Sequence, residues 1–178
     1  MLPADRIRTL LRESDDPHHL ERPQNFDLHI AAHRFAHLTR ASRDRFGPTC
    51  TSGLRQDASD YGEITIPAAA TGLGHPLWID LSNFGGFVTA GTADWAGPDP
   101  TAGLTEEFVT WLDGVCTAAG CTFVPLELLL EPYDGPSALE DDEAFAALVA
   151  QFVDVSEEDE TDERRLPLAW ADRYFQWM

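Results

Sequence analysis

The chain has 178 residues and a formal net charge of −19, with 43% hydrophobic and 24% charged residues. This length favours one domain, and the composition is that of a globular rather than a disordered protein. No stretch approaches the roughly 18 to 20 apolar residues of a membrane span, and the acidic N-terminus lacks the apolar segment of a secretory signal. The three cysteines lack paired or metal-type spacing, which argues against a disulfide framework and favours a reducing, cytoplasmic location.

The charge is distributed unevenly along the chain. All 12 basic residues are Arg, and nine of them lie in residues 1–55, whereas residues 56–178 contain three Arg and 24 acids. The absence of Lys is typical of a GC-rich bacterial genome. A surface this negative repels nucleic acid and anionic lipid, and it attracts basic proteins. The sequence therefore predicts a basic protein partner, no nucleic acid and no membrane, with solubility alone as the alternative role of the charge.

Two helices are predicted in the N-terminal part of the chain. The first covers residues 4–14, where apolar residues recur at helical spacing, and the second covers residues 27–46 and ends at Gly47–Pro48. The expected apolar stripe of the second helix consists of Leu28, Ala31, Ala32, Phe35 and Phe46. Residues 47–61 are expected to be irregular.

A β-meander is predicted next, because the apolar period changes to two. Residues 63–67 form one expected strand, and residues 76–92 form an antiparallel hairpin with its turn at Asn83–Gly86. Leu77, Ile79 and Leu81 alternate with Trp78, Asp80 and Ser82. This alternation is typical of a strand with one buried face.

The C-terminal part is predicted to be mainly helical. Thr105 begins a helix over residues 105–119 that Gly120 ends, and residues 121–124 are a candidate strand. Residues 125–130 fit a strand or a helix, and a capping box at Ser137 and Glu140 predicts a further helix over about 137–152. An acidic, mobile segment near residues 156–165 precedes a helical, aromatic C-terminus. The sum is one α+β domain over residues 1–178, in which a short antiparallel sheet packs against helices in two layers.

Candidate chemical groups give no catalytic motif. His29, His33 and His37 share one helix face, but no further ligand is identifiable in the sequence, so we expect a polar surface without metal. Cys116 and Cys121 lack redox spacing and are expected to be buried thiols. No catalytic residue and no cofactor is predicted.

Aromatic and acidic residues are the predicted partner-binding groups, because Trp anchors many interfaces and carboxylates attract a basic surface. The predicted set is Trp95, Glu157, Glu158, Asp159, Glu160, Trp170 and Trp177. The alternative for the Trp residues is that they complete a small core.

Three segments, Gln56–Tyr61, Ile64–Pro67 and Leu81–Thr89, together with a Tyr-Asp-Gly turn at 133–135, resemble small bacterial proteins. Some of these resemble immunity proteins of polymorphic toxin systems. The resemblance implies a non-enzymatic protein that neutralises a basic toxin by occlusion. The alternative is a small enzyme or biosynthetic accessory protein, with a pocket near the 76–92 hairpin that uses Asp57, Asp80 or His75.

Overall fold

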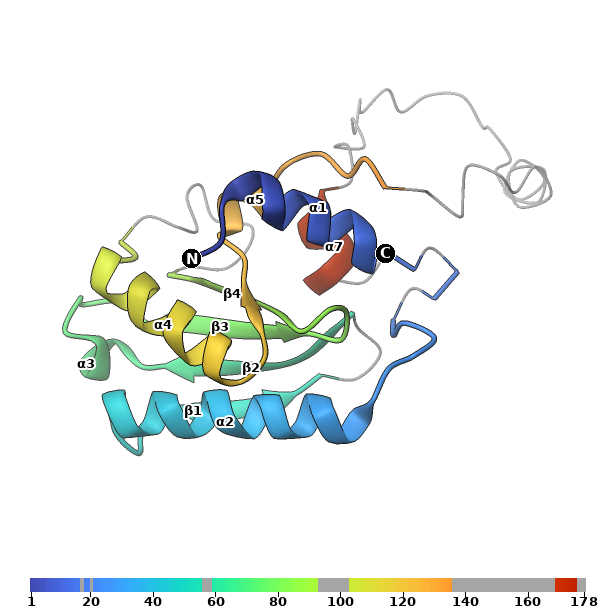
Figure 1. Cartoon of the computed structure of the whole chain (residues 1–178). Coiled ribbons are helices and arrows are strands. Elements are labelled where there is room, and N and C mark those ends of the chain that lie inside the picture. Colours follow the sequence, from blue (N-terminus) through green and yellow to red (C-terminus); the bar gives the residue numbers. More distant parts are fainter. Residues whose placement is uncertain (17, 20, 56–58, 93–102, 136–168, 176–178) are drawn as a thin grey trace, which may run out of the picture.

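The computed structural model describes the chain except for residues 17, 20, 56–58, 93–102, 136–168 and 176–178 (Figure 1). Its helices are α1 (Ala4–Ser14), α2 (Leu28–Phe46), α3 (Ala68–Thr71), α4 (Glu106–Ala118), α5 (Leu126–Leu129) and α7 (Trp170–Phe175). Its strands are β1 (Thr51–Leu54), β2 (Asp60–Ile66), β3 (Leu77–Ser82), β4 (Phe87–Gly91) and β5 (Thr122–Phe123). These elements confirm the predicted α+β class. No helix among the described residues is both long and apolar enough to cross a bilayer.

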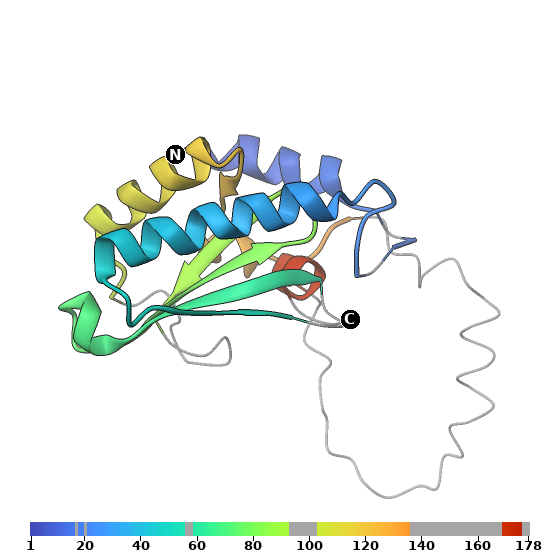
Figure 2. The same cartoon turned by 90° about the horizontal axis from the view of Figure 1, so that it is seen from below.

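The five strands form one sheet in the order β1-β2-β3-β4-β5. The first four strands pair antiparallel, whereas β5 pairs parallel to β4 because α4 carries the chain back across the sheet. The sheet is therefore mixed, where the sequence predicted an antiparallel one. Figure 2 shows α2 and α4 lying on one side of the sheet.

The predicted hairpin is confirmed. β3 and β4 pair with Ile79 opposite Ala90, and the Phe87 amide donates to the Phe84 carbonyl across the turn at 3.2 Å. Gly85 and Gly86 have φ values of 57° and 70°, a backbone region that costs residues with a Cβ atom more than glycine. The two glycines thus determine where the chain reverses.

The apolar layer between the helices and the sheet, here called the sheet core, is the first of two buried clusters. It contains Phe35, Leu38, Cys50, Ile64, Ile66, Leu77, Ile79, Leu81, Val88, Ala90, Phe108, Leu112, Cys116, Cys121 and Phe123. α4 forms where a helix was predicted and buries Phe108, Leu112 and Cys116, and the Thr105 hydroxyl accepts from the Phe108 amide at 3.2 Å to cap it. The stripe of α2 is partly wrong: Ala31 and Phe35 are buried, but Leu38 continues the stripe while Leu28 and Ala32 are exposed.

Two further expectations are corrected by the sheet. Residues 51–54, expected to be irregular, form the edge strand β1, whose four residues are all exposed and so give no hydrophobic alternation. β3 is buried on both faces rather than one, since Asp80 and Ser82 are only 1% and 3% exposed. The Ser82 hydroxyl donates to the Tyr174 carbonyl at 2.8 Å, so α7 covers this end of the second face.

The second buried cluster, here called the terminal cluster, brings the two ends of the chain together. It contains Ile7, Leu11, Phe84, Phe87, Val124, Leu126, Leu128, Leu129, Trp170, Ala171, Tyr174 and Phe175. The helical prediction for the C-terminus is confirmed for α7. The helix predicted at 137–152 and the acidic segment at 156–165 lie outside the described residues.

Candidate functional site

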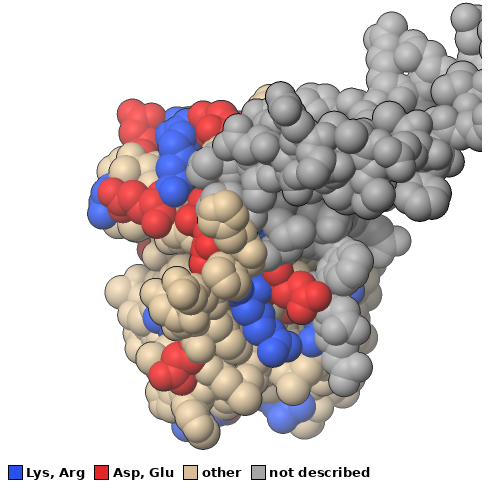
Figure 3. Space-filling model, turned by 90° about the vertical axis from the view of Figure 1, so that its right-hand side faces the viewer, with Lys and Arg blue, Asp and Glu red and all other residues tan. Residues whose placement is uncertain are grey.

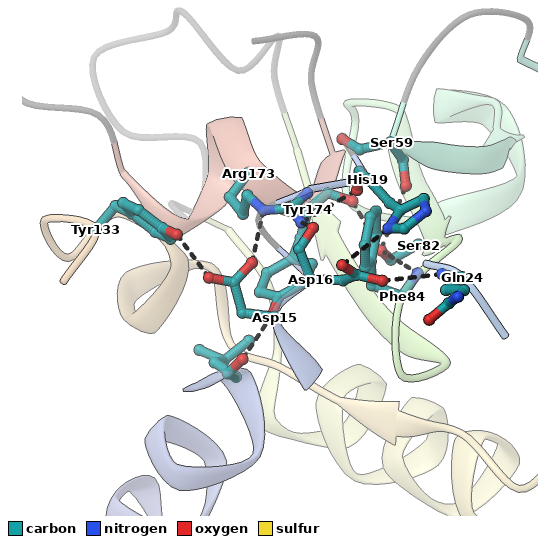
Figure 4. A network of polar contacts seen from close by, with 11 residues as sticks. Asp15, Asp16, His19, Gln24, Ser59, Ser82, Phe84, Tyr133, Arg173 and Tyr174 are labelled. Atoms are coloured by element: carbon teal, nitrogen blue, oxygen red, sulfur yellow. Dashed lines mark hydrogen bonds and ion pairs between the residues drawn. The ribbon is translucent and has the colours of Figure 1, made fainter. Parts of the chain in front are cut away.

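A buried ion pair joins the end of α1 to α7 (Figure 4). Arg173 Nε donates to Asp15 Oδ1 at 2.7 Å, and neither side chain has any exposed area. Tyr133 Oη donates to the other carboxylate oxygen of Asp15 at 2.5 Å. Arg173 Nη2 also donates to the carbonyls of Asp16 and His19, at 2.8 and 3.3 Å. The Asp15 carboxylate thus has a partner on each oxygen, which offsets the cost of burying two charges.

Aromatic rings enclose this ion pair. The Arg173 guanidinium lies 4.3 Å from the centre of the Phe84 ring, and the Tyr174 ring stacks on Trp170 at 5.6 Å. Tyr174 Oη donates to the Leu11 carbonyl at 2.5 Å. Burial raises the pKa of Tyr174 and of Tyr133, so both phenols remain protonated donors at neutral pH. The network fixes α7 against α1 and the hairpin turn.

Side-chain hydrogen bonds hold the loop between α1 and α2. Asp16 accepts from the Gln24 amide at 2.9 Å and contacts His19 Nδ1 at 3.0 Å, and these contacts lower the pKa of its carboxyl group. Asn83 Nδ2 donates to the Glu21 carbonyl at 3.1 Å. The loop is therefore tied to the hairpin turn.

Two neighbouring clefts lie between this loop and the turn, one beside α2 and the other beside the end of α1. The turn cleft, of about 220 Å³, has Phe26, Ile30, Arg34 and Gly86 among its lining residues. The acidic cleft, of about 430 Å³, is lined in part by Glu13, Asp15 and Asp16. Pro23, Asn25 and Gly85 line both clefts, so the two adjoin. The turn cleft lies beside the predicted hairpin, but Asp80 and His75, which were named for the pocket of the alternative function, are not among its lining residues.

The two clefts differ in the state of their charged groups. In the acidic cleft, Asp15 and Asp16 are bonded to Arg173 and His19. In the turn cleft, Arg34 is half-buried and makes no hydrogen bond or ion pair within the described part of the chain. Its guanidinium lies against the turn, because a Cβ atom on Gly86 would stand 2.6 Å from Nη1 and 2.9 Å from Cζ. Arg34 is thus an available cation in an enclosed position.

Of the predicted partner-binding residues, Trp170 is the one that lies among the described residues. Trp170 is 3% exposed and packs between Tyr133 and Tyr174, so its expected place on the surface is wrong and the core alternative applies to it. Trp95, Glu157, Glu158, Asp159, Glu160 and Trp177 all lie outside the described residues. Their part in binding stays a prediction.

The other candidate groups are placed as follows. His29 and His33 are exposed on α2 and His37 is half-buried, and the described residues contain no group of three potential metal ligands. Cys116 and Cys121 are buried free thiols as predicted, and burial raises the pKa of Cys121 to about 11.

The groups named for the enzyme alternative do not meet in one pocket. Asp57 lies outside the described residues, Asp80 is buried within the sheet, and His75 lies against Gly103. No Ser, Thr or Cys side chain among the described residues is hydrogen-bonded to a His ring.

Asp15, Arg34, Tyr133 and Arg173 were not identified from the sequence as site residues. One signal for Arg173 was available, since it is a single Arg within an aromatic helical segment, next to Tyr174. Comparisons with family models, curated proteins and solved structures found no match. The site is therefore interpreted from its own residues.

Proposed function

We propose that this protein is a non-enzymatic binding protein that captures a basic protein partner and occludes it. The observation that carries the proposal is its charge. The chain has 31 acidic residues and 12 Arg, an excess of 19 carboxylates even when every Arg is paired. Such an excess steers a cationic partner and raises its association rate by about 10 to 1,000-fold at low salt.

Several arginines among the described residues stabilise the fold through ion pairs. Arg8 pairs with Glu131, Arg12 with Asp134, Arg45 with Glu107, Arg55 with Glu63 and Arg173 with Asp15. Figure 3 shows the same arrangement on one face, where acidic and basic residues lie next to one another. Pairs of this kind stabilise the fold, but they leave the excess of carboxylates unchanged. The excess is therefore available to attract a partner.

The resemblance to immunity proteins suggests the kind of partner. A toxin whose active site binds phosphate has a cationic surface, and an acidic protein blocks that surface by covering it. Steering increases the rate of association, whereas tight binding also needs a desolvated anchor. Trp95 and Trp177 are the proposed anchors, with Glu157, Glu158, Asp159 and Glu160 as the steering charges.

The test is the salt dependence of the association rate with a partner captured from the source organism. Between about 50 and about 500 mM salt we expect the association rate to fall at least tenfold, with little change in dissociation. Neutralising residues 157–160 by Gln and Asn substitutions should slow association without unfolding the protein. A matched control neutralises four exposed acids of the body: Glu13, Asp44, Glu106 and Glu127.

The outcomes separate the competing functions. An association rate that does not change with salt would exclude electrostatic capture. If both quadruple variants slow association equally, the net charge of the protein attracts the partner, and residues 157–160 have no special part in it. Turnover of a small molecule by the purified protein alone would replace the binding function with the enzyme alternative.

A further inference from the structure

We infer that the turn cleft is a binding site for a carboxylate group carried on a small apolar body, with Arg34 as the side chain that binds the anion. This inference depends on the turn cleft alone and not on the proposed capture of a basic partner. It begins from the unusual state of Arg34. The side chain is half-buried in the cleft and has no bonding partner among the described residues.

An unpaired guanidinium is costly in such a position. It carries five N–H donors, and removing it from water without replacing those hydrogen bonds is unfavourable. Elsewhere in the body, Arg8 and Arg173 lose water too, but each donates to a carboxylate at 2.7 to 2.8 Å. A carboxylate ligand would give Arg34 the same kind of partner, because its two oxygens match the guanidinium fork.

The hairpin turn gives the guanidinium its position. Gly86 has a φ of 70°, and a Cβ atom there would lie within 3 Å of Nη1 and of Cζ of Arg34. The side chain therefore rests on bare backbone, which limits its rotation. A cation that is already oriented loses less entropy when it binds a ligand.

The walls and the size of the cleft indicate what carries the carboxylate. Phe26, Ala31 and Leu81 line it, and Ile30 stands at its side with 50% of its surface exposed. The volume of about 220 Å³ is below the roughly 300 to 1,000 Å³ of sites for drug-sized ligands. A branched apolar group about as large as one amino-acid side chain is the best match.

Asp27 adds a preference between ligands. It also lines the cleft, and its Oδ1 accepts from the amides of His29 and Ile30 at 2.8 and 3.1 Å. No ion pair joins it to Arg34, which follows seven residues later, about 10 Å along the helix axis. A second carboxylate on the ligand would be repelled by Asp27, so monocarboxylates should bind better than dicarboxylates.

Two sources supply this chemistry: a free branched carboxylic acid, or the C-terminal carboxylate of a polypeptide that ends in an apolar residue. The experiment is an NMR titration of the 15N-labelled full chain with isobutyrate and with its neutral analogue isobutyramide. A parallel titration uses a short peptide ending in Leu, with either a free or an amidated C-terminus. Succinate tests the expected preference for one charge.

We expect isobutyrate or the free peptide to shift the amide signals of Ile30, Gly85 and Gly86 saturably. The carboxylate should bind at least about tenfold more tightly than its amide analogue. Arg34→Gln should abolish this binding, and Arg34→Lys should weaken it because the ammonium cannot form two parallel bonds. Arg40→Gln is the matched control, since Arg40 is an exposed Arg of the same helix without an ion pair among the described residues.

Binding by the free peptide alone assigns the source to a polypeptide, and binding by isobutyrate as well assigns it to a free acid. The inference is overturned if neither ligand gives a saturable shift. It is also overturned if amides bind as tightly as acids, or if Arg34→Gln binds like the wild type while its spectrum shows a folded protein.

Discussion

The sheet core and the terminal cluster are both closely packed, but different interactions hold them. The sheet core consists almost entirely of apolar side chains between α2, α4 and the strands. The terminal cluster surrounds the buried pair of Asp15 and Arg173, which are 158 residues apart. Truncating an apolar side chain lowers the free energy of unfolding in proportion to the atoms removed. A buried charge instead depends on a single partner, whose loss leaves it unpaired. The two regions should therefore respond differently to single substitutions.

The largest effect is expected from breaking the ion pair on one side. Arg173→Met leaves the Asp15 carboxylate buried with Tyr133 as its remaining side-chain donor. Removing one partner of a buried pair typically costs about 3 to 5 kcal/mol in the free energy of unfolding. Chemical denaturation monitored by tryptophan fluorescence measures it.

The double variant Asp15→Asn with Arg173→Met is the matched control, because it removes both charges together. It should be more stable than Arg173→Met alone, since no unpaired charge stays buried. Equal stability of the single and double variants would mean that the charge of Asp15 is not what makes the loss of Arg173 costly.

The next effect compares two neighbouring leucines, of which Leu129 belongs to the terminal cluster and Leu130 does not. Leu129 is fully buried, whereas Leu130 is 48% exposed. Leu129→Ala should cost about 2 to 5 kcal/mol in the free energy of unfolding, and Leu130→Ala about 0.5 kcal/mol or less. Denaturation curves of both variants test this, and a similar cost for the two would show that the cluster is not closely packed around Leu129.

A third effect depends on pH and lies where the two regions meet. Asp60 pairs in register with Ser82 and is 2% exposed, and burial raises the pKa of its carboxyl to about 6 despite Arg55 Nε at 3.0 Å. The unfolded chain releases this proton near pH 4, so between about pH 4 and 6 the native state binds more protons than the unfolded one. The stability due to Asp60 is therefore full below about pH 4 and is lost as the pH rises through about 6.

The measurement is the difference in unfolding free energy between the wild type and Asp60→Asn. Taking the difference removes the opposite contributions of Asp16, Glu131 and Asp134, whose pKa values are lowered. Relative to the variant, the wild type should lose up to about 3 kcal/mol between about pH 4 and pH 7. A constant difference over this range would show that Asp60 titrates normally.

Most elements of the sheet core could be predicted from the sequence, because the residue patterns that specify them are local. The turn at Asn83–Gly86 follows from residue types that accept positive φ, and α4 follows from its apolar period and the Thr105 cap. β1 was missed because its exposed side chains show no alternation. The parallel pairing of β5 was missed because a strand of two residues does not specify its neighbour.

The terminal cluster and the clefts were not predictable in the same way. Asp and Arg are residue types that usually lie on the surface, and Asp15 and Arg173 are brought together only by the tertiary fold. Trp170 was interpreted as an interface anchor because nothing near it in the sequence indicates that Tyr133 and Tyr174 enclose it. Arg34 and Arg40 lie on the same helix, and what places Arg34 in the turn cleft is the packing of the turn against it, which is a tertiary contact.

The smallest effect is expected at the exposed counterpart of the buried pair. Arg12 Nη2 and Asp134 Oδ2 lie 2.5 Å apart, yet their side chains are 48% and 52% exposed. This contact also joins residues far apart in the chain, and it lowers the pKa of the Asp134 carboxyl. Because water and salt screen an exposed pair, Arg12→Gln should change stability far less than Arg173→Met does.

The small loss of stability in Arg12→Gln should be present at low salt and disappear in denaturation curves at about 0.5 M salt, where the Debye length is only a few ångströms. The loss in Arg173→Met should persist at that salt concentration, because its partner is shielded from ions by the surrounding protein. If instead salt removes both losses equally, the Asp15 site is open to solvent, and the difference between the two regions would be one of composition rather than of burial.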